Sequence, residues 1–369
     1  MSDVESRNGK LRVLVVGVGN MGMSHAKAYD KIEGFELAGL CARKIAKRVD
    51  LPEKWSNVPR FGNYEGALET LRPDVVSVNT WPDTHADFAV RAFESGAHVF
   101  MEKPIAETVK DGRRVVAAAR AAKKKLVIGY ILRVHPSWVE FVKRAKGLGK
   151  PLVMRMNLNQ QSIGAAWTWH KNLMKSLPPI VDCGVHYVDV MCQMTGAKPK
   201  RVHAIGAHLT KEVKTYNYGQ LQVEFDDGSV GWYEAGWGPM MSEVAFFVKD
   251  VVGPKGCASI VMAEEGKSAG EGASGTTSAD IDTHTKTNAI RVHHAKLNED
   301  NSLAKADEVL RMDDEPDHDE LCEREQLFLL NAIRNNVDLS DHMEDAVNSL
   351  RIVLAADESV RTKKVVTLR

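Results

Sequence analysis

The sequence predicts an α/β protein in which a doubly wound parallel sheet is followed by a second domain of mostly antiparallel sheet. Over residues 11–129, short Val-rich runs alternate with stretches of helical period, as in successive strand and helix units of a parallel sheet. From Pro151 the strands have alternating apolar and polar faces, which is typical of antiparallel sheet. The 369 residues suffice for two domains, predicted at 1–130 and 131–369.

The first domain is predicted to contain five strands separated by helices. Each strand is a short apolar run of the length of a buried strand. The runs are LRVLVVG from Leu11, FELAGLC from Phe35, DVVSVNT from Asp74, AHVFME from Ala97 and KLVIGY from Lys125. Helices are predicted over 84–95 and 107–123, with Thr84 and Thr108 near their starts, because Thr is a frequent N-cap.

In the second domain a helix is predicted from Pro136 to about Gly147, since Pro favours the first helical position. The clearest hairpin is Gln220–Trp237, with its turn at Asp227-Gly228. Leu221, Val223 and Phe225 would point one way, and Val230 and Trp232 would resume the alternation.

Two further segments of the second domain differ from the strands in composition and in the spacing of their apolar residues. Residues 265–280 contain almost nothing apolar and many small residues, which predicts a mobile loop. The tail over 315–361 has apolar residues at helical spacing, so it is predicted to be helical and to pack against the sheet.

Composition excludes several classes of function. Forty-nine basic and forty-nine acidic side chains cancel, so no net field attracts nucleic acid or an anionic membrane. The five cysteines form no C-x-x-C pair, and we expect reduced core thiols and no metal site. The polar N-terminus and the absence of a long apolar run favour a cytoplasmic protein.

A glycine-rich turn follows the first strand and is the strongest functional signal. Residues 17–22 read GVGNMG, which matches the dinucleotide-binding fingerprint between a strand and a helix. Gly17 permits the tight turn, Gly19 lets the backbone approach a pyrophosphate, and Gly22 allows close helix packing. Asn20 and Met21 complete the predicted cofactor loop. A purely structural glycine turn is the alternative.

The end of the second strand indicates which nicotinamide cofactor is bound. The fingerprint expects an acidic residue there to hold the ribose hydroxyls, but the sequence continues Ala42-Arg43-Lys44. Two cations in place of a carboxylate suit a 2′-phosphate. We therefore favour NADP over NAD, although Arg43 and Lys44 could simply begin a solvated helix.

Three motifs occur in order along the chain: GVGNMG, the triplet Glu102-Lys103-Pro104 and DCGVHYVD over 182–189. Together they resemble the Gfo/Idh/MocA family of sugar and polyol oxidoreductases. The resemblance implies an N-terminal Rossmann domain, a C-terminal domain with a large open sheet, and an active site between them. It implies that Thr80, Trp81, Pro82 and His85 line the cofactor loop, that Glu102 holds the nicotinamide ribose, that Lys103 reaches the reacting carbon, and that Asp182 and His186 form the substrate-binding and catalytic pair.

The residues around DCGVHYVD support a site independently. Between Val181 and Met194 a helix would be apolar nearly all round, except for one stripe of Asp182, His186, Asp189 and Gln193. Short titratable groups on such a helix indicate that the stripe faces a cleft. The alternative is a buried histidine that Asp189 satisfies for structural reasons.

Other candidate residues have two interpretations each. Lys103 follows a strand of a parallel sheet, where ligands bind, but a lysine there is often only solvated; a cis bond to Pro104 is possible. Arg133 is a candidate for binding substrate hydroxyls, or it is a solvated or interdomain charge. Trp167 and His170, in WTWHKNLMK, suit a sugar face, although core packing of the tryptophans is equally expected. The usual glycine-rich run before DCGVHYVD is replaced by SLPPI.

Taken together, these residues predict an NAD(P)-dependent dehydrogenase or reductase acting on a secondary alcohol or ketone of a sugar, polyol or glycoside. His186 would take the proton, Lys103 would stabilise the alkoxide, and the fingerprint would hold the cofactor. A glycoside-cleaving or epimerising enzyme with a recycled cofactor, and a non-catalytic sugar-sensing regulator, are the alternatives. An open sheet face usually needs a cover, which predicts a homodimer or homotetramer.

Overall fold

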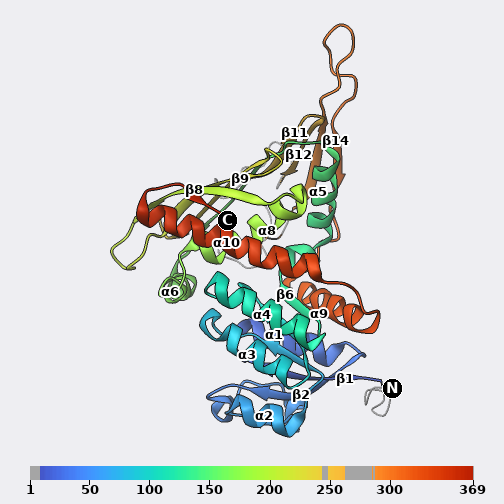
Figure 1. Cartoon of the computed structure of the whole chain (residues 1–369), viewed down its shortest axis with the longest axis vertical. Coiled ribbons are helices and arrows are strands. Elements are labelled where there is room, and N and C mark those ends of the chain that lie inside the picture. Colours follow the sequence, from blue (N-terminus) through green and yellow to red (C-terminus); the bar gives the residue numbers. More distant parts are fainter. Residues whose placement is uncertain (1–8, 243–247, 262–284, 286, 369) are drawn as a thin grey trace. The chain divides into compact units, whose positions relative to one another are not determined.

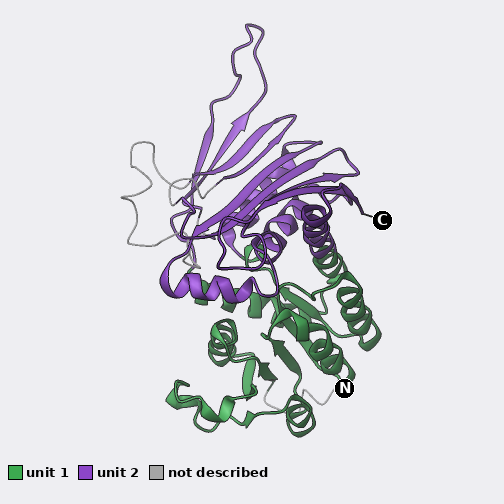
Figure 2. Cartoon of the chain, turned by 90° about the vertical axis from the view of Figure 1, so that its left-hand side faces the viewer, with its two compact units in different colours: residues 1–134, 317–347 green, residues 135–316, 348–369 purple. Residues whose placement is uncertain are grey.

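The computed structural model describes residues 9–242, 248–261, 285 and 287–368, which form two compact units (Figure 2). Unit 1 comprises residues 1–134 and 317–347, and unit 2 comprises 135–316 and 348–369. The sequence predicts one domain over 131–369, whereas residues 317–347 group with the N-terminal segment in the structure. The predicted loop at 265–280 lies outside the described residues.

Unit 1 is built on a six-stranded parallel sheet in the order β3-β2-β1-β4-β5-β6. Its strands are β1 (Leu11–Val16), β2 (Phe35–Cys41), β3 (Arg60–Phe61), β4 (Val75–Val78), β5 (His98–Glu102) and β6 (Leu126–Gly129). The five predicted strands are all present, because each Val-rich run is buried almost throughout. The order reverses between β1 and β4, and such switch points are where open α/β sheets bind ligands.

Helices surround this sheet in Figure 1. They are α1 (Asn20–Lys31), α2 (Tyr64–Leu71), α3 (Pro82–Glu94), α4 (Val109–Ala122) and α9 (His318–Arg334). Thr108 caps α4 by accepting a hydrogen bond from the Asp111 amide. In contrast, α3 begins at Pro82 with Trp81 as its N-cap, so Thr84 lies inside the first turn. Short 3-10 turns lie at Ile45–Lys47, Glu53–Trp55 and Ile131–Arg133.

Unit 2 contains a nine-stranded, mostly antiparallel sheet in the order β14-β13-β12-β11-β7-β10-β9-β8-β15. The strands are β7 (Val153–Gln161), β8 (Pro199–Ala207), β9 (Tyr218–Phe225), β10 (Val230–Gly238), β11 (Lys249–Gly253), β12 (Gly256–Val261), β13 (Ala289–His294), β14 (Glu308–Arg311) and β15 (Val366–Thr367). The neighbours β7 and β10 are parallel. The sheet is therefore mixed.

The predicted hairpin is present, but its second strand presents a different face to the core. Leu221 and Val223 on β9 are buried. On β10 the buried residues include Tyr233, Ala235 and Trp237, whereas Val230 is 40% exposed. Val230 and Trp232 lie on the outer face because they pair with Glu224 and Gln222 in the β9 register.

One face of the second sheet is covered by helices. These are α5 (Pro136–Gly147), α6 (Gly164–Leu173), α7 (Pro179–Asp182) and α8 (Gly184–Thr195). The predicted helical tail forms two helices, because α10 (Ser340–Thr362) follows α9 after a short connection. Helix α9 packs on α1 within unit 1. No helix within the described residues combines the length and the apolar character that a membrane crossing requires.

Candidate functional site

The glycine turn after β1 requires glycine at two positions. Gly17 has a φ of +82°, and a Cβ there would lie 2.4 Å from the carbonyl oxygen of Asn79. A Cβ on Gly22 would lie 1.8 Å from the carbonyl oxygen of Gly17. Both contacts are far closer than side chains allow, so these glycines let α1 pack directly on the turn.

Gly19 is different, because the space around it is open. It is the N-cap of α1, no side chain caps the helix, and no acidic residue lies in the first turn. A Cβ on Gly19 would have no protein atom within 4 Å. The first amides of α1 therefore face open space beside Asn20 and Met21, which suits an anion such as a pyrophosphate. The residues of this turn fit a dinucleotide cofactor.

The segment after β2 carries an arginine that the sequence analysis did not select. Arg43 and Lys44 are exposed, as expected. Arg48 donates to the Val18 carbonyl in the glycine turn and forms a two-point ion pair with Asp50, at 2.5 and 2.6 Å. The Arg48 hydrogen bond lowers the pKa of Asp50. The helical spacing of Lys44, Lys47 and Arg48 gave no signal for this contact, which depends on the chain turning back towards β1.

His85 connects two loops at the carboxyl ends of β4 and β5. Its ring nitrogens lie 2.8 Å from the Pro104 carbonyl oxygen and 3.0 Å from the Thr80 carbonyl oxygen. The side chain is completely buried, and this burial lowers the pKa of the imidazole. His85 thus holds the loop instead of lining its surface, whereas Trp81 beside it is 49% exposed and Pro82 begins α3.

The Glu102-Lys103-Pro104 triplet ends β5. The Lys103-Pro104 peptide bond is cis, and Lys103 is half-buried. Glu102 is 8% exposed and lies 2.9 Å from Nε2 of His25, with its Oε1 atom as acceptor. Burial alone would raise the pKa of Glu102, but the hydrogen bond from His25 and the neighbouring charges together outweigh it, and the pKa is lowered. Glu102 is therefore a carboxylate at neutral pH.

A cluster of potential metal ligands lies next to this carboxylate. His25, Cys322 and Glu325 each place one such atom within 4.8 Å of the others. Burial, followed by the charge of Glu102, raises the pKa of Glu325 well above its usual value, and burial also raises the pKa of Cys322. Both His25 nitrogens are already in hydrogen bonds. A cation needs deprotonated ligands, so this cluster favours protons over a metal.

In unit 2, DCGVHYVD folds as the end of α7 and the start of α8, with Cys183 between them. Asp182 is 9% exposed and His186 is half-buried. Asp189 is 1% exposed and accepts a hydrogen bond of 3.0 Å from Gln193. Asp189 and its partner Gln193 thus have a structural role in the predicted polar stripe. Asp182 and His186 are the two residues of the stripe that stay candidates for substrate binding and catalysis.

An aromatic cluster in unit 2 contains His170. The His170 ring stacks on Trp237 at 4.3 Å, and the Trp237 indole nitrogen donates to Gln160 at 2.9 Å. Nδ1 of His170 is buried and has no hydrogen-bond partner in the part of the chain that the structure describes. Burial lowers the pKa of His170 to about 4, although the charge of Asp182 acts in the opposite direction. His170 is therefore a neutral ring near Asp182.

The tryptophans of α6 have separate environments. Trp167 is 7% exposed and its indole nitrogen lies 3.3 Å from Glu212, which also binds Lys171. Trp169 is 50% exposed. Trp169, which the sequence analysis did not select, has the open ring that a sugar face requires. Trp237 and Gln160 carried no sequence signal at all, because both are ordinary strand residues.

Arg133, the remaining predicted substrate residue, lies in unit 1. Its guanidinium forms an ion pair of 2.7 Å with Asp345 and lies 5.7 Å from the Tyr130 ring centre. These contacts all lie within unit 1, so the structure shows Arg133 as a paired charge of that unit. A contact with substrate stays a prediction.

Two features define the class of protein: a parallel sheet with open helix amides at its switch point, and a mixed sheet packed on a helix that carries His186 and Asp189. They are the features of a two-domain dinucleotide-binding oxidoreductase. The chain belongs to the Gfo/Idh/MocA family. Residues 11–130 match the model of the oxidoreductase family with an NAD-binding Rossmann fold, and residues 142–257 match the model of the Gfo/Idh/MocA C-terminal domain.

Curated relatives are dehydrogenases. The chain is 28% identical to scyllo-inositol 2-dehydrogenase (NAD(+)) of Bacillus subtilis over 61% of this chain and 67% of that protein. It is 24% identical to D-glucoside 3-dehydrogenase of Escherichia coli over 69% of this chain and 78% of that protein. Among solved structures, UDP-N-acetylglucosamine 3-dehydrogenase from Acidithiobacillus ferrooxidans has a TM-score of 0.73 at 20% identity, covering 96% of this chain and 98% of that one. The last comparison shows the shared fold.

Proposed function

We propose that the protein is an NAD(P)-dependent dehydrogenase or reductase for a secondary alcohol or ketone of a sugar, polyol or glycoside. The observation that carries this proposal is the open space at Gly19, at the amide end of α1 and at the switch point of the sheet. Its family relatives named for inositol and glucoside substrates support the substrate class.

In this reaction the bound nicotinamide supplies a hydride acceptor or donor. Protein side chains transfer the hydroxyl proton and stabilise the negative charge on the substrate oxygen. We assign the proton to His186, which is half-buried on α8 and close in sequence to the buried Asp182. Lys103, at the carboxyl end of β5, would stabilise the alkoxide that forms as hydride leaves. Asp182 would bind substrate and orient it.

The substrate would be held by the aromatic cluster of unit 2. The exposed ring of Trp169 offers an apolar face for carbon–hydrogen bonds of a sugar. Neutral His170 has a buried ring nitrogen without a partner among described residues, and a contact of this nitrogen with a substrate hydroxyl requires a local movement that exposes it. Trp167 is buried, so it would pack behind this surface, on the side of the protein interior, instead of contacting the substrate.

We propose NADP as the preferred cofactor, with NAD as the alternative. The preference rests on Arg43 and Lys44, which are exposed directly after β2, where a carboxylate would otherwise repel a 2′-phosphate. Arg48 adds a third positive charge beside the glycine turn, although Asp50 neutralises part of it.

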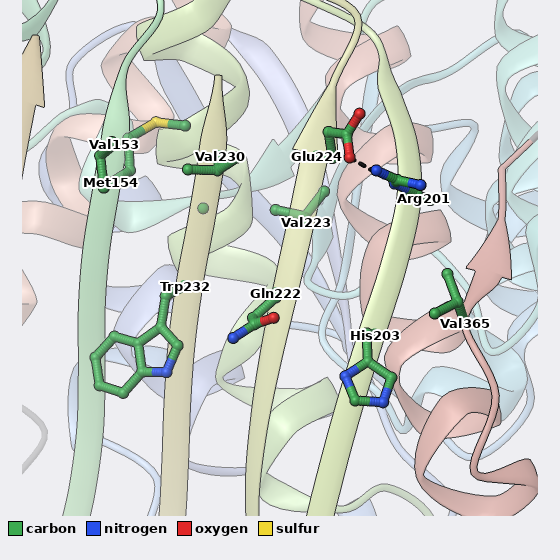
Figure 3. A pocket seen from close by; sticks show the side chains of 11 residues that line it. Val153, Met154, Arg201, His203, Gln222, Val223, Glu224, Val230, Trp232 and Val365 are labelled. Atoms are coloured by element: carbon green, nitrogen blue, oxygen red, sulfur yellow. Dashed lines mark hydrogen bonds and ion pairs between the residues drawn. The ribbon is translucent and has the colours of Figure 1, made fainter. Parts of the chain in front are cut away.

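We also propose that two copies associate through the outer face of the second sheet. Val153, Val230 and Ile205 are 44%, 40% and 53% exposed there. A shallow hollow of about 450 Å³ crosses β7, β10, β9 and β8, and Trp232, Gln222 and His203 line it (Figure 3). This hollow does not include the motif residues, so it is a candidate for association and not for catalysis. Exposed apolar surface of this kind favours a partner.

We propose the cytoplasm as the cellular compartment, on the basis of the cysteines. All five cysteines are free, and four of them are buried. Free thiols persist in a reducing compartment, which supports the cytoplasm as the place of action.

The test is a panel of sugars, polyols and glycosides, each incubated with NAD or with NADP while absorbance of the reduced nicotinamide is followed. The proposal predicts turnover with at least one polyol or sugar. Tight binding of cofactor with no turnover across a broad panel, in both directions, would instead indicate a sensing role.

A further inference from the structure

Glu102 belongs to a continuous chain of buried hydrogen bonds that ends in helix α9. Tyr29 donates to Oε1 of Gln326 at 2.5 Å, and Nε2 of Gln326 lies 3.0 Å from Nδ1 of His25. Nε2 of His25 lies 2.9 Å from Oε1 of Glu102. All four side chains lie in unit 1, and Tyr29, Gln326 and His25 have no exposed surface.

The orientation of the Gln326 amide determines which nitrogen of His25 carries the proton. Because the Gln326 oxygen accepts from Tyr29, its NH₂ group faces Nδ1 of His25, and this nitrogen must accept. The proton of a neutral His25 is therefore on Nε2, directed at Glu102. The reverse amide orientation would place an oxygen against Nδ1 and would leave no proton for Glu102 unless the ring were charged.

At the other end of this chain of hydrogen bonds, both oxygens of the Glu102 carboxylate are held in place. Oε2 of Glu102 accepts from the Lys103 amide at 3.2 Å, so one carboxylate oxygen is held by His25 and the other by the backbone of the next residue. Gly129, which pairs with Glu102 across the sheet, leaves the required space, because a Cβ there would lie 3.3 Å from Oε1.

We propose that Gln326, through His25, is a positioning residue for Glu102 in cofactor binding. Helix α9 is then part of the cofactor site, although Gln326 is more than 200 residues from Glu102 in the sequence and α9 contains no residue of the three motifs. This inference rests on the proposed function only for the statement that Glu102 contacts the cofactor. The tautomer of His25 is independent of it.

The decisive variant is Gln326→Met, which keeps the length and volume of the side chain and removes both hydrogen bonds. The matched control is Asp319→Asn. Asp319 also joins α9 to α1, through Ser24 at 2.9 Å and Lys27 at 3.3 Å, but it lies on the surface. Loss of packing between the two helices would affect both variants, whereas loss of positioning affects only Gln326→Met.

Two measurements are made on the full chain. Nitrogen NMR of ¹⁵N-histidine-labelled protein, with His25 assigned by comparison with His25→Gln, reports the tautomer; we expect a proton on Nε2 in the wild type and a mixture in Gln326→Met. Calorimetric titration with NADPH and NADH should show roughly tenfold weaker binding for Gln326→Met and unchanged binding for Asp319→Asn.

The possible results distinguish failure of the role of Gln326 from failure of the proposed function. A wild-type His25 protonated on Nδ1, or equal cofactor affinity for wild type and Gln326→Met, would overturn the inference while leaving the proposed function intact. If the wild type binds neither cofactor, the proposed function fails and so does the role of Gln326 in cofactor binding, even where the NMR result holds.

Discussion

Nδ1 of His85 lies 2.8 Å from the carbonyl oxygen of Pro104, although the two residues belong to different loops of unit 1. The other ring nitrogen faces the Thr80 carbonyl oxygen at 3.0 Å. A neutral imidazole has one N–H group, so it donates to one of these carbonyls at a time. His85 therefore couples the loop of Trp81 to the loop of Lys103 by a single buried side chain.

Replacing this side chain should disturb both loops. In His85→Phe the carbonyl oxygens of Pro104 and Thr80 lose the ring nitrogens that face them, and we expect the free energy of unfolding to fall by about 1–3 kcal/mol. Cofactor affinity should fall as well, because the two loops lose their connection. Thermal unfolding and calorimetric titration check this. An unchanged affinity in a destabilised variant would limit His85 to a structural role.

The cofactor preference is tested at the end of β2. Changing Ala42 to Asp and Arg43 to Ser should shift preference from NADP to NAD, because the carboxylate repels a 2′-phosphate and bonds a free hydroxyl. The ratio of kcat/KM for the two cofactors measures the change. A wild type that already prefers NAD tenfold would contradict the assignment of Arg43.

His186 is expected to be the general base. His186→Ala should lower kcat about a hundredfold or more while cofactor affinity is retained. His293→Ala, on β13 of the second sheet, is the matched control and should leave kcat unchanged. Near-full activity in His186→Ala would leave the stripe on α8 with a structural role only.

Lys103 and His186 are the two proposed carriers of the proton, and pH profiles decide between them. Lys103→Met keeps most of the side-chain length and removes the charge, so kcat should fall strongly and the fold should persist. Loss of the basic limb in the His186 variant alone would assign the base to His186. If both variants keep the wild-type profile, another group carries the proton.

Acid stability should depend on His342, which accepts a hydrogen bond from the Ile128 amide at 2.9 Å. Burial lowers the pKa of His342 to about 3. Between this value and the ordinary histidine pKa of about 6.5, the unfolded chain binds a proton that the folded chain does not. Stability from this group is therefore present at neutral pH and lost as the pH falls through that window.

The size of this effect is about 1.4 kcal/mol per pH unit for one group. His98 and His170, each with a pKa lowered to about 4 by burial, act with the same sign. Denaturant titrations between pH 7 and 4 should show a shallower loss of stability in His342→Gln, whose amide oxygen can still accept from Ile128. Equal slopes for wild type and variant would show that His342 is not buried as a neutral ring.

Much of unit 1 could be predicted because its signals are local. The Val-rich run at Leu11–Val16 and the Thr108 cap depend on residues next to them in the chain. Thr84 was a weaker indicator, since Pro82 is a stronger helix start two residues earlier. The outward face of Val230 was not predictable, because register with β9 and cover by α8 decide it.

The candidate site shows the same division. The glycine turn and the Glu102-Lys103-Pro104 triplet are short motifs and could be found in the sequence. The contacts of Glu102 with His25, of Arg48 with Val18 and of His170 with Trp237 join residues that are 77, 30 and 67 positions apart. Only folding brings these partners together, so no spacing in the sequence indicates them.

The most direct test of the central claim is titration of NADPH and NADH into wild type and Gly19→Val. Gly19 has a φ of −84° and open space around its missing Cβ, so valine should be tolerated by the fold and should block only the pyrophosphate. Gly147→Val, at the end of α5, also enters open space and is the control. The account predicts binding to wild type and to the control, and none to Gly19→Val at an unchanged melting temperature. Equal cofactor affinity in Gly19→Val and wild type would contradict it.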